Sequence, residues 1–173
     1  DSEWPCEQHR DIFHLTGIDQ EETILIVYPA SKNHKTREIL FIRKSDNHTK
    51  VWEGEKLSKK QANELSGIDN IYYTEDFKDV LSSIATKVDT FYINKNEHYR
   101  ANSPVETRED RFISWLLKKY PAHNVAKSNP ILQRQRSIKH PYEIDQIKRA
   151  CEITEKGFNL SLIHIWRCRR IRR

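Results

Sequence analysis

Short apolar segments rich in β-branched residues alternate along the chain with segments of helical periodicity. This alternation restricts the possible folds more than any other feature. TILIVY (residues 23–28), EILFI (38–42), IYY (71–73) and DTFYI (89–93) have the composition of buried strands. Strands that alternate with helices are typical of a layered α/β fold. We therefore predict an α/β domain in which a β-sheet is flanked by helices.

Polar residues that suit helix N-caps stand before three of the helical segments. They are Ser58, Thr74 and Thr107. The first of these helices is expected to end at Gly67 and the second to run to Val88. The third begins with a capping box that has Asp110 in place of the usual Glu, and it ends just before Pro121.

Residues 123–136 show no helical period, so we predict an irregular connecting stretch there. A further helix begins with Pro141 in its first turn. Its apolar stripe consists of Ile144, Ile147, Cys151, Thr154 and Phe158. An amphipathic helix gains most of its stability from packing. We therefore expect the partners of this stripe to belong to a longer protein, of which this chain is a fragment.

The positive charge of the chain comes from its last residues. The chain has 30 Lys and Arg against 25 Asp and Glu, and five of the arginines lie within residues 160–173, which contain no acid. Clustered arginines could bind the phosphates of a nucleic acid. However, LSLIHIWRCRRIRR does not suit continuation of the preceding helix and resembles a translated sequencing-library adapter. We predict that residues 160–173 are non-native, with a genuine basic tail as the alternative, and we expect no nucleic-acid partner.

Composition excludes several other classes of protein. The chain has 17 aromatic residues (Trp 4, Tyr 7 and Phe 6), which argues against disorder, and its three cysteines are too few for a disulfide scaffold. No apolar run approaches the ~18 residues that a membrane span needs.

The residue patterns predict no complete active site. His9 and His14 lack a Cys or carboxylate at a metal-ligand spacing, so we interpret them as surface or half-buried histidines. Cys151 lies on the apolar stripe, which favours a small buried side chain over a nucleophile. Trp52, in KVWEGEKLS, is either a core residue or the wall of a ligand pocket. The residues by themselves favour the core.

Three segments, in this order and spacing, resemble the aminopeptidase P family. They are DSEWPCEQHRDIFHLTGID (residues 1–19), KVWEGEKLSKKQANELSGID (50–69) and SIKHPYEIDQIKRACEITEKGF (137–158). The segment VETREDRFISWLLKKYPAH (105–123) is also similar to that of bacterial members. The chain departs from the family pattern at Cys6, His9 and His140, where an aromatic residue, Asn and a capping Ser are usual.

The resemblance implies a mixed β-sheet flanked by helices, followed by a fragment of a pita-bread domain. Residues 1–124 would form the N-terminal domain, without the first strand and helix of the family. Residues 125–136 would be a linker, and residues 137–159 the first helix of the catalytic domain. Residues 160–173 would be the non-native tail.

Aminopeptidase P enzymes remove an N-terminal residue that precedes proline, using two divalent metal ions, usually manganese. The family's metal ligands lie in the pita-bread domain, so the resemblance assigns no metal ligand and no catalytic residue to this chain. It does match Trp52 to a tryptophan near the substrate pocket that a neighbouring subunit contributes. With this match, pocket wall and core become equally plausible for Trp52.

The expected parent protein is accordingly a cytoplasmic, homo-oligomeric enzyme acting on Xaa-Pro peptides. This chain would assist oligomer assembly and close the substrate pocket. A different class of function stays open, because the same N-terminal domain resembles one used without catalysis in the large subunit of the histone chaperone complex FACT. Such a module would bind proteins.

Overall fold

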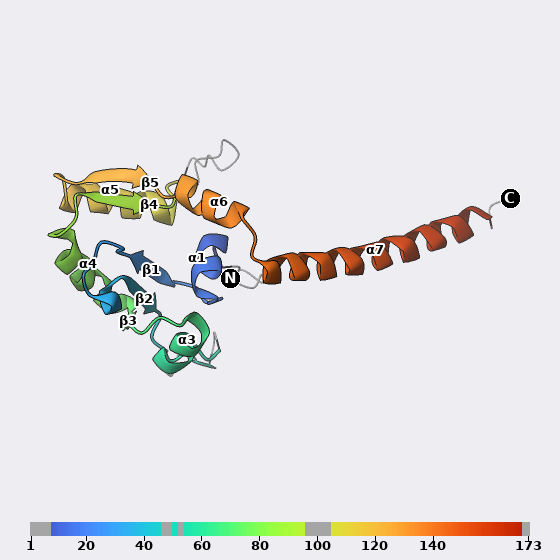
Figure 1. Cartoon of the computed structure of the whole chain (residues 1–173), viewed down its shortest axis with the longest axis horizontal. Helices are drawn as coiled ribbons and strands as arrows, with labels where there is room; N and C mark the ends of the chain where they lie inside the picture. Colours follow the sequence, from blue (N-terminus) through green and yellow to red (C-terminus); the bar gives the residue numbers. More distant parts are fainter. Residues whose placement is uncertain (1–7, 46–49, 52–53, 96–104, 171–173) are drawn as a thin grey trace. The chain divides into compact units, whose positions relative to one another are not determined.

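The computed structural model describes residues 8–45, 50–51, 54–95 and 105–170. The chain divides into two units, the first made of Asp1–Tyr92 and Asn102–Ala126, and the second of Ile93–Ala101 and Lys127–Arg173. In chain order (Figure 1), the elements are α1 (Arg10–Thr16), β1 (Ile24–Val27), η1 (His34–Thr36), β2 (Glu38–Ile42), α3 (Lys59–Ser66), β3 (Ile71–Tyr73), η2 (Thr74–Asp76), α4 (Phe77–Ala85), β4 (Thr90–Ile93), α5 (Arg108–Lys119), β5 (Asn124–Lys127), α6 (Asn129–Ser137) and α7 (Pro141–Arg170).

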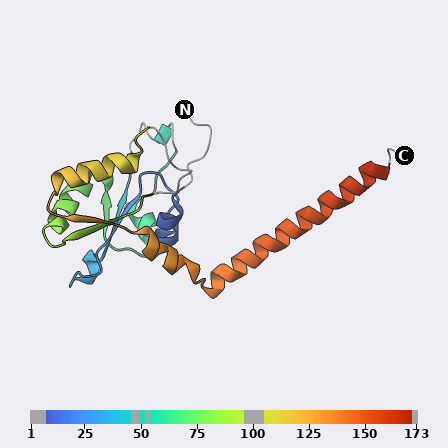
Figure 2. The same cartoon turned by 90° about the horizontal axis from the view of Figure 1, so that it is seen from above.

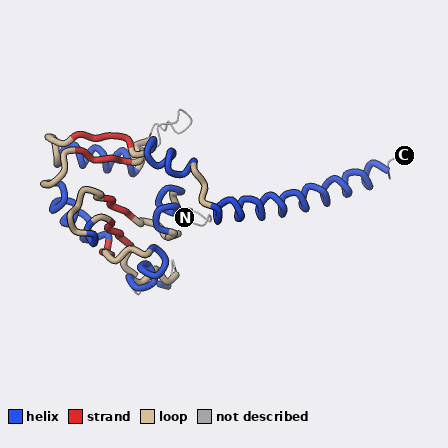
Figure 3. Tube along the Cα trace, in the orientation of Figure 1, coloured by secondary structure: helices blue, strands red, loops and turns tan. Residues whose placement is uncertain are grey.

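The first unit contains a three-stranded mixed sheet with β2 in its centre (Figures 1 and 3). β1 runs antiparallel to β2 and places Ile24 opposite Phe41. β3 runs parallel to β2 and places Ile71 opposite Leu40. The mixed α/β fold predicted from the sequence is confirmed, and all four predicted strands form. β1 is two residues shorter than expected and β4 one residue shorter.

β2 is buried on both of its faces. Successive side chains of a strand point to opposite sides of the sheet, and Leu40, Phe41 and Ile42 are all 0% exposed. On one face, Leu40 and Ile42 join a core cluster with Ile18, Ala62, Ile68 and Ile71. On the other face, the ring of Phe41 meets that of Phe77 from α4 edge-on, with centroids 5.3 Å apart. Helices and loops therefore cover the centre of the sheet from both sides.

α3 begins and ends as the sequence predicts. The hydroxyl of Ser58 accepts a hydrogen bond from the backbone N–H of Gln61, and the Gln61 side chain accepts one from the N–H of Ser58. This reciprocal pair is a capping box. The helix ends at Gly67, whose φ of 70° lies in the left-handed region that glycine adopts without a steric penalty.

The helix predicted from Thr74 is shorter than expected. Thr74–Asp76 forms the 3₁₀ turn η2, and the α-helix proper begins at Phe77, so the predicted cap at Thr74 is wrong. The helix also ends at Ala85 instead of Val88. Beyond its end, the N–H groups of Lys87 and Val88 donate to carbonyls three residues back, and this tighter bonding ends the α-helix.

α5 starts with the predicted capping box. The Thr107 hydroxyl accepts from the N–H of Asp110 at 3.2 Å, and the Asp110 carboxylate accepts from the N–H of Thr107 at 3.1 Å. α5 packs against α4 (Figure 2). Ring centroids of Phe77 and Phe112 lie 5.9 Å apart, and the hydroxyls of Ser82 and Tyr120 are 2.9 Å apart.

The predicted irregular stretch at residues 123–136 is wrong. It contains β5 and α6. The N–H of Asn124 donates to Asp89 O and that of Ser128 to Ile93 O, so β5 lies alongside β4 in the same direction. β5 is short and mostly exposed, and it is held by this pairing with a distant strand, which the local sequence does not reveal. In α6, Pro130 occupies the first turn, where its missing N–H is not needed.

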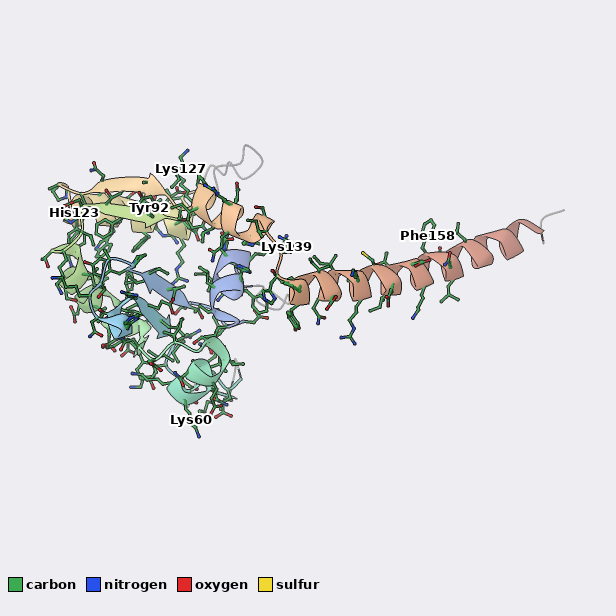
Figure 4. All side chains as sticks on the ribbon, viewed as in Figure 1. Lys60, Tyr92, His123, Lys127, Lys139 and Phe158 are labelled. Atoms are coloured by element: carbon green, nitrogen blue, oxygen red, sulfur yellow. The ribbon has the colours of Figure 1, made fainter. Side chains whose placement is uncertain are left out.

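α7 runs for 30 residues to Arg170, so the expectation that the segment from residue 160 would not continue the helix is wrong for residues 160–170, and residues 171–173 lie outside the described part of the chain. At its start, the imidazole Nδ1 of His140 accepts a hydrogen bond from the N–H of Tyr142. The predicted burial of Cys151 is also wrong, because this residue is exposed. Phe158 on the same stripe is 64% exposed (Figure 4). Neither α7 nor any other described helix is long and apolar enough to cross a membrane.

Candidate functional site

Trp52, the pocket residue suggested by the sequence, lies outside the described residues, as does Glu53. The chain on either side of these two residues is described. Val51 is exposed, and Gly54 has a φ of 81°, a left-handed conformation that favours glycine. The Nζ atom of Lys50 and the carboxylate of Glu55 are 3.4 Å apart, so an exposed ion pair joins the two sides.

The segment that follows Gly54 is fixed by a hydrogen bond to a distant glutamine. The N–H of Leu57 donates to Oε1 of Gln20 at 2.8 Å, between residues 37 positions apart. Gln20 is only 6% exposed. The side chain of Leu57 packs against the core cluster beside β2. The contacts of Leu57 with Gln20 and with the core cluster therefore fix the backbone just before α3.

A partly buried ion network lies next to this hydrogen bond. The Glu21 carboxylate pairs with the ammonium of Lys56, whose side chain is only 10% exposed, and with Arg43 Nη1 at 3.4 Å. Burial of the carboxyl tends to raise its pKa. The hydrogen bond and charge of Lys56, together with the charge of Arg43, outweigh that effect, so the pKa of Glu21 lies below its ordinary value.

The turn that carries Gln20 and Glu21 is itself tightly held. The carbonyl of Gln20 accepts hydrogen bonds from Gln8 Nε2 at 2.6 Å and from the Thr23 hydroxyl at 2.7 Å. Glu22 has a φ of 59°, which non-glycine residues adopt rarely and at an energetic cost. The hydrogen bonds to the carbonyl of Gln20 thus help to hold the backbone at Glu22 in an unfavourable conformation.

His9 and His14, the two histidines considered for metal binding, lie at the start and in the last turn of α1. Nδ1 of His9 accepts from the N–H of Asp11 and caps α1, and His14 lies in the last turn of the same helix. Within the described residues, no group of three or more His, Cys, Asp and Glu could hold a metal ion. The described side chains next to the Trp52 segment supply hydrogen bonds and ion pairs that position the backbone of residues 54–57.

Sequence reasoning missed Gln20, Glu21, Arg43 and Lys56. Each stands in a polar context typical of the surface, and their contacts join residues far apart in the chain. The only local signal is Lys56, which lies between a glycine and a helix cap. That signal is too common to single out a residue.

Comparison with known proteins places the chain beside one family. The family model described as "Aminopeptidase P, N-terminal domain" matches residues 1–92. The Xaa-Pro aminopeptidase of Escherichia coli (strain K12) is 26% identical over 160 residues, which cover 89% of this chain and 35% of that protein. Human Xaa-Pro aminopeptidase 3 is 22% identical over 161 residues, covering 91% of this chain and 31% of that protein.

Solved structures give the same result. An aminopeptidase P from E. coli in a low-pH form superimposes with a TM-score of 0.71 at 26% identity, covering 89% of this chain and 35% of that one. A zinc-substituted E. coli aminopeptidase P in complex with product has the same TM-score, identity and coverage. The chain spans about a third of the length of these relatives.

Proposed function

The chain belongs to the aminopeptidase P family, and from this premise we propose that it is the non-catalytic N-terminal part of a metal-dependent Xaa-Pro aminopeptidase. The parent enzyme would hydrolyse the bond after an N-terminal residue that precedes proline. The family model, which describes an N-terminal domain, carries the proposal. The names of the E. coli and human relatives support the substrate class.

The metal ions of the proposed enzyme would be bound by residues outside this chain. We propose two divalent ions, Mn²⁺ in the first instance, which would activate a water molecule as the nucleophile. The zinc-substituted E. coli structure supports a metal-dependent reaction in the family. Residues 137–159 would begin the catalytic domain, and residues 125–136, with most of α6, would connect the two domains.

This chain would contribute to oligomer assembly and to closing the pocket over short Xaa-Pro peptides. In this proposal, Trp52 forms part of the pocket wall in the homo-oligomer. The well-anchored segment after Gly54 supports the assignment, because a pocket wall needs a fixed backbone. We also propose that the parent protein is cytoplasmic.

A peptidase assay tests the non-catalytic assignment. The purified 173-residue chain with Mn²⁺ is expected to release no N-terminal residue from an Xaa-Pro-Xaa peptide, since no metal-binding group exists among its described residues. Release of that residue above the rate of a metal-free control would contradict the assignment.

A chimera tests the pocket role of Trp52. Residues 1–158 would replace the corresponding segment of the E. coli Xaa-Pro aminopeptidase. The chimera is expected to cleave the peptide, and Trp52→Ala is expected to raise KM by about five- to tenfold with kcat changed less than about twofold. Tyr92→Ala, which removes an exposed aromatic ring from β4 (Figure 4), serves as the matched control. Equal KM values for the two variants would remove Trp52 from the pocket.

A further inference from the structure

The side chain of Gln20 is buried and uses its amide oxygen as a hydrogen-bond acceptor. Its Oε1 accepts a hydrogen bond from the N–H of Leu57 at 2.8 Å, whereas its Nε2 has no hydrogen-bond partner among the residues that the structure describes. A buried donor without a partner costs free energy. The amide oxygen of Gln20 thus accepts a backbone hydrogen bond, while its amide nitrogen gains no compensating hydrogen bond within the described part of the chain. Without that acceptor, the N–H of Leu57 would lose its partner.

Glu21 holds the residue next to Leu57. Its carboxylate pairs with Lys56, whose side chain is almost entirely buried, and Arg43 flanks the same oxygen at 3.4 Å. Gln20 and Glu21, consecutive in one turn, thus bind Leu57 and Lys56, which are consecutive in another segment. Gln20 binds a backbone N–H, and Glu21 binds a charged side chain. Attachment at two adjacent points fixes both the position of a segment and its direction.

The turn can act as a fixed support because it is held independently. Gln8 and Thr23 both donate to the carbonyl of Gln20, and Glu22 keeps a left-handed conformation. A strained conformation persists only where the surroundings over-determine it, and such places are frequent at functional sites. The turn formed by residues 20–22 also lies just before β1, which anchors it to the sheet.

We propose that Gln20 and Glu21 are positioning residues that, through Leu57 and Lys56, fix the segment leading from Trp52 into α3. The contacts of these four residues are called the clasp below. Trp52 stands only four residues before Lys56 in the sequence, so the clasp sets the end of the segment to which it belongs. The catalytic relevance of the clasp rests on the proposed function, because Trp52 must be held only if it forms part of the pocket.

Hydrogen exchange of backbone amides in the 173-residue chain tests the clasp. Gln20→Met keeps the length of the side chain and removes its acceptor. It is expected to speed exchange at the Leu57 amide by about tenfold, with the Leu40 amide of β2 changed less than about twofold. Gln20→Glu keeps an acceptor and is expected to retain most of the Leu57 protection. An unchanged Leu57 rate, or equal acceleration at Leu40, would overturn the proposal.

Gln61→Met is the matched control. It makes the same chemical change at another glutamine, one that accepts from the neighbouring N–H of Ser58 at 2.9 Å. This variant is expected to speed exchange at Ser58 and to leave Leu57 unchanged. If Gln20→Met does not fold, Gln20→Asn withdraws the acceptor by one methylene, and the same comparison of Leu57 with Leu40 decides the outcome.

Fluorescence then tests whether the clasp positions Trp52. Replacing the other three tryptophans, Trp4, Trp115 and Trp166, by Phe leaves Trp52 as the single reporter. In this background, Gln20→Met is expected to change the acrylamide quenching constant of Trp52 by at least about twofold, and Gln61→Met to leave it unchanged. An unchanged constant in Gln20→Met would overturn the positioning role.

Both measurements are made without substrate. A failure of the clasp is therefore distinguishable from a failure of the pocket assignment, which the KM values of the chimera decide on their own.

Discussion

Replacing Phe41 with alanine is expected to lower the free energy of unfolding of the first unit by about 3–5 kcal/mol. The side chain is fully buried in the central strand and contacts the rings of Tyr72 and Phe77. The substitution removes this buried apolar area and leaves a cavity between the sheet and α4, which the surrounding side chains can fill only in part. Because a domain is stable by only about 5–15 kcal/mol, the loss would be a large part of the total.

Urea unfolding followed by circular dichroism measures this effect. Val27→Ala is the control, because Val27 belongs to the same sheet but is 52% exposed, and it is expected to change the free energy of unfolding by less than about 1 kcal/mol. Similar losses for the two variants would show that the face of β2 carrying Phe41 is not a packed core.

The second large effect is expected from Glu21→Gln, which should lower the free energy of unfolding by about 1–3 kcal/mol. The variant removes the negative charge that Glu21 places against the largely buried ammonium of Lys56. Removing one member of a buried pair costs more than removing both. The double variant Glu21→Gln/Lys56→Met should therefore be more stable than Glu21→Gln alone, as measured by a double-mutant cycle in urea. Strict additivity of the two substitutions would contradict the pairing.

The same carboxylate gives stability a defined dependence on pH. The pKa of Glu21 is lower in the folded chain than the ordinary value near 4.5, so the unfolded chain binds this proton more readily. The stabilisation is thus fully present above the unfolded pKa and is lost as pH falls through the lower, folded pKa. Urea unfolding between pH 7 and pH 3 should show a smaller acid loss for Glu21→Gln than for the parent chain. Parallel profiles would contradict this assignment.

The sequence predicted the elements whose signals are local. Apolar β-branched runs identified the four strands from β1 to β4, and the N-cap residue Ser58 and the capping box at Thr107 identified the starts of α3 and α5. These features depend on neighbouring residues, so they can be read in a short window. β5 was missed because it is held by pairing with β4, and α6 was missed because it buries no residue to produce a periodic pattern.

The candidate site was less predictable than the fold. Trp52 was named from its motif, and its role stays a prediction. The clasp could not be predicted from the sequence, since the hydrogen bond from Leu57 to Gln20 joins the segment before α3 to the turn before β1, 37 positions earlier in the chain. The same limit explains the wrong prediction for Cys151. The helix that carries its apolar stripe forms as predicted, but no described element covers the stripe, so Cys151 is exposed.

The parallel pairing of β2 with β3 has a consequence for the order in which the first unit folds. β1 and β2 form an antiparallel pair joined by a short connection, which can close early. The most buried strand gains its second neighbour only after the chain has passed through α3 and reached Ile71–Tyr73. On the ribosome, the core would therefore stay open until the chain beyond Tyr73 has emerged. Pairing between strands so distant in sequence also favours slow folding.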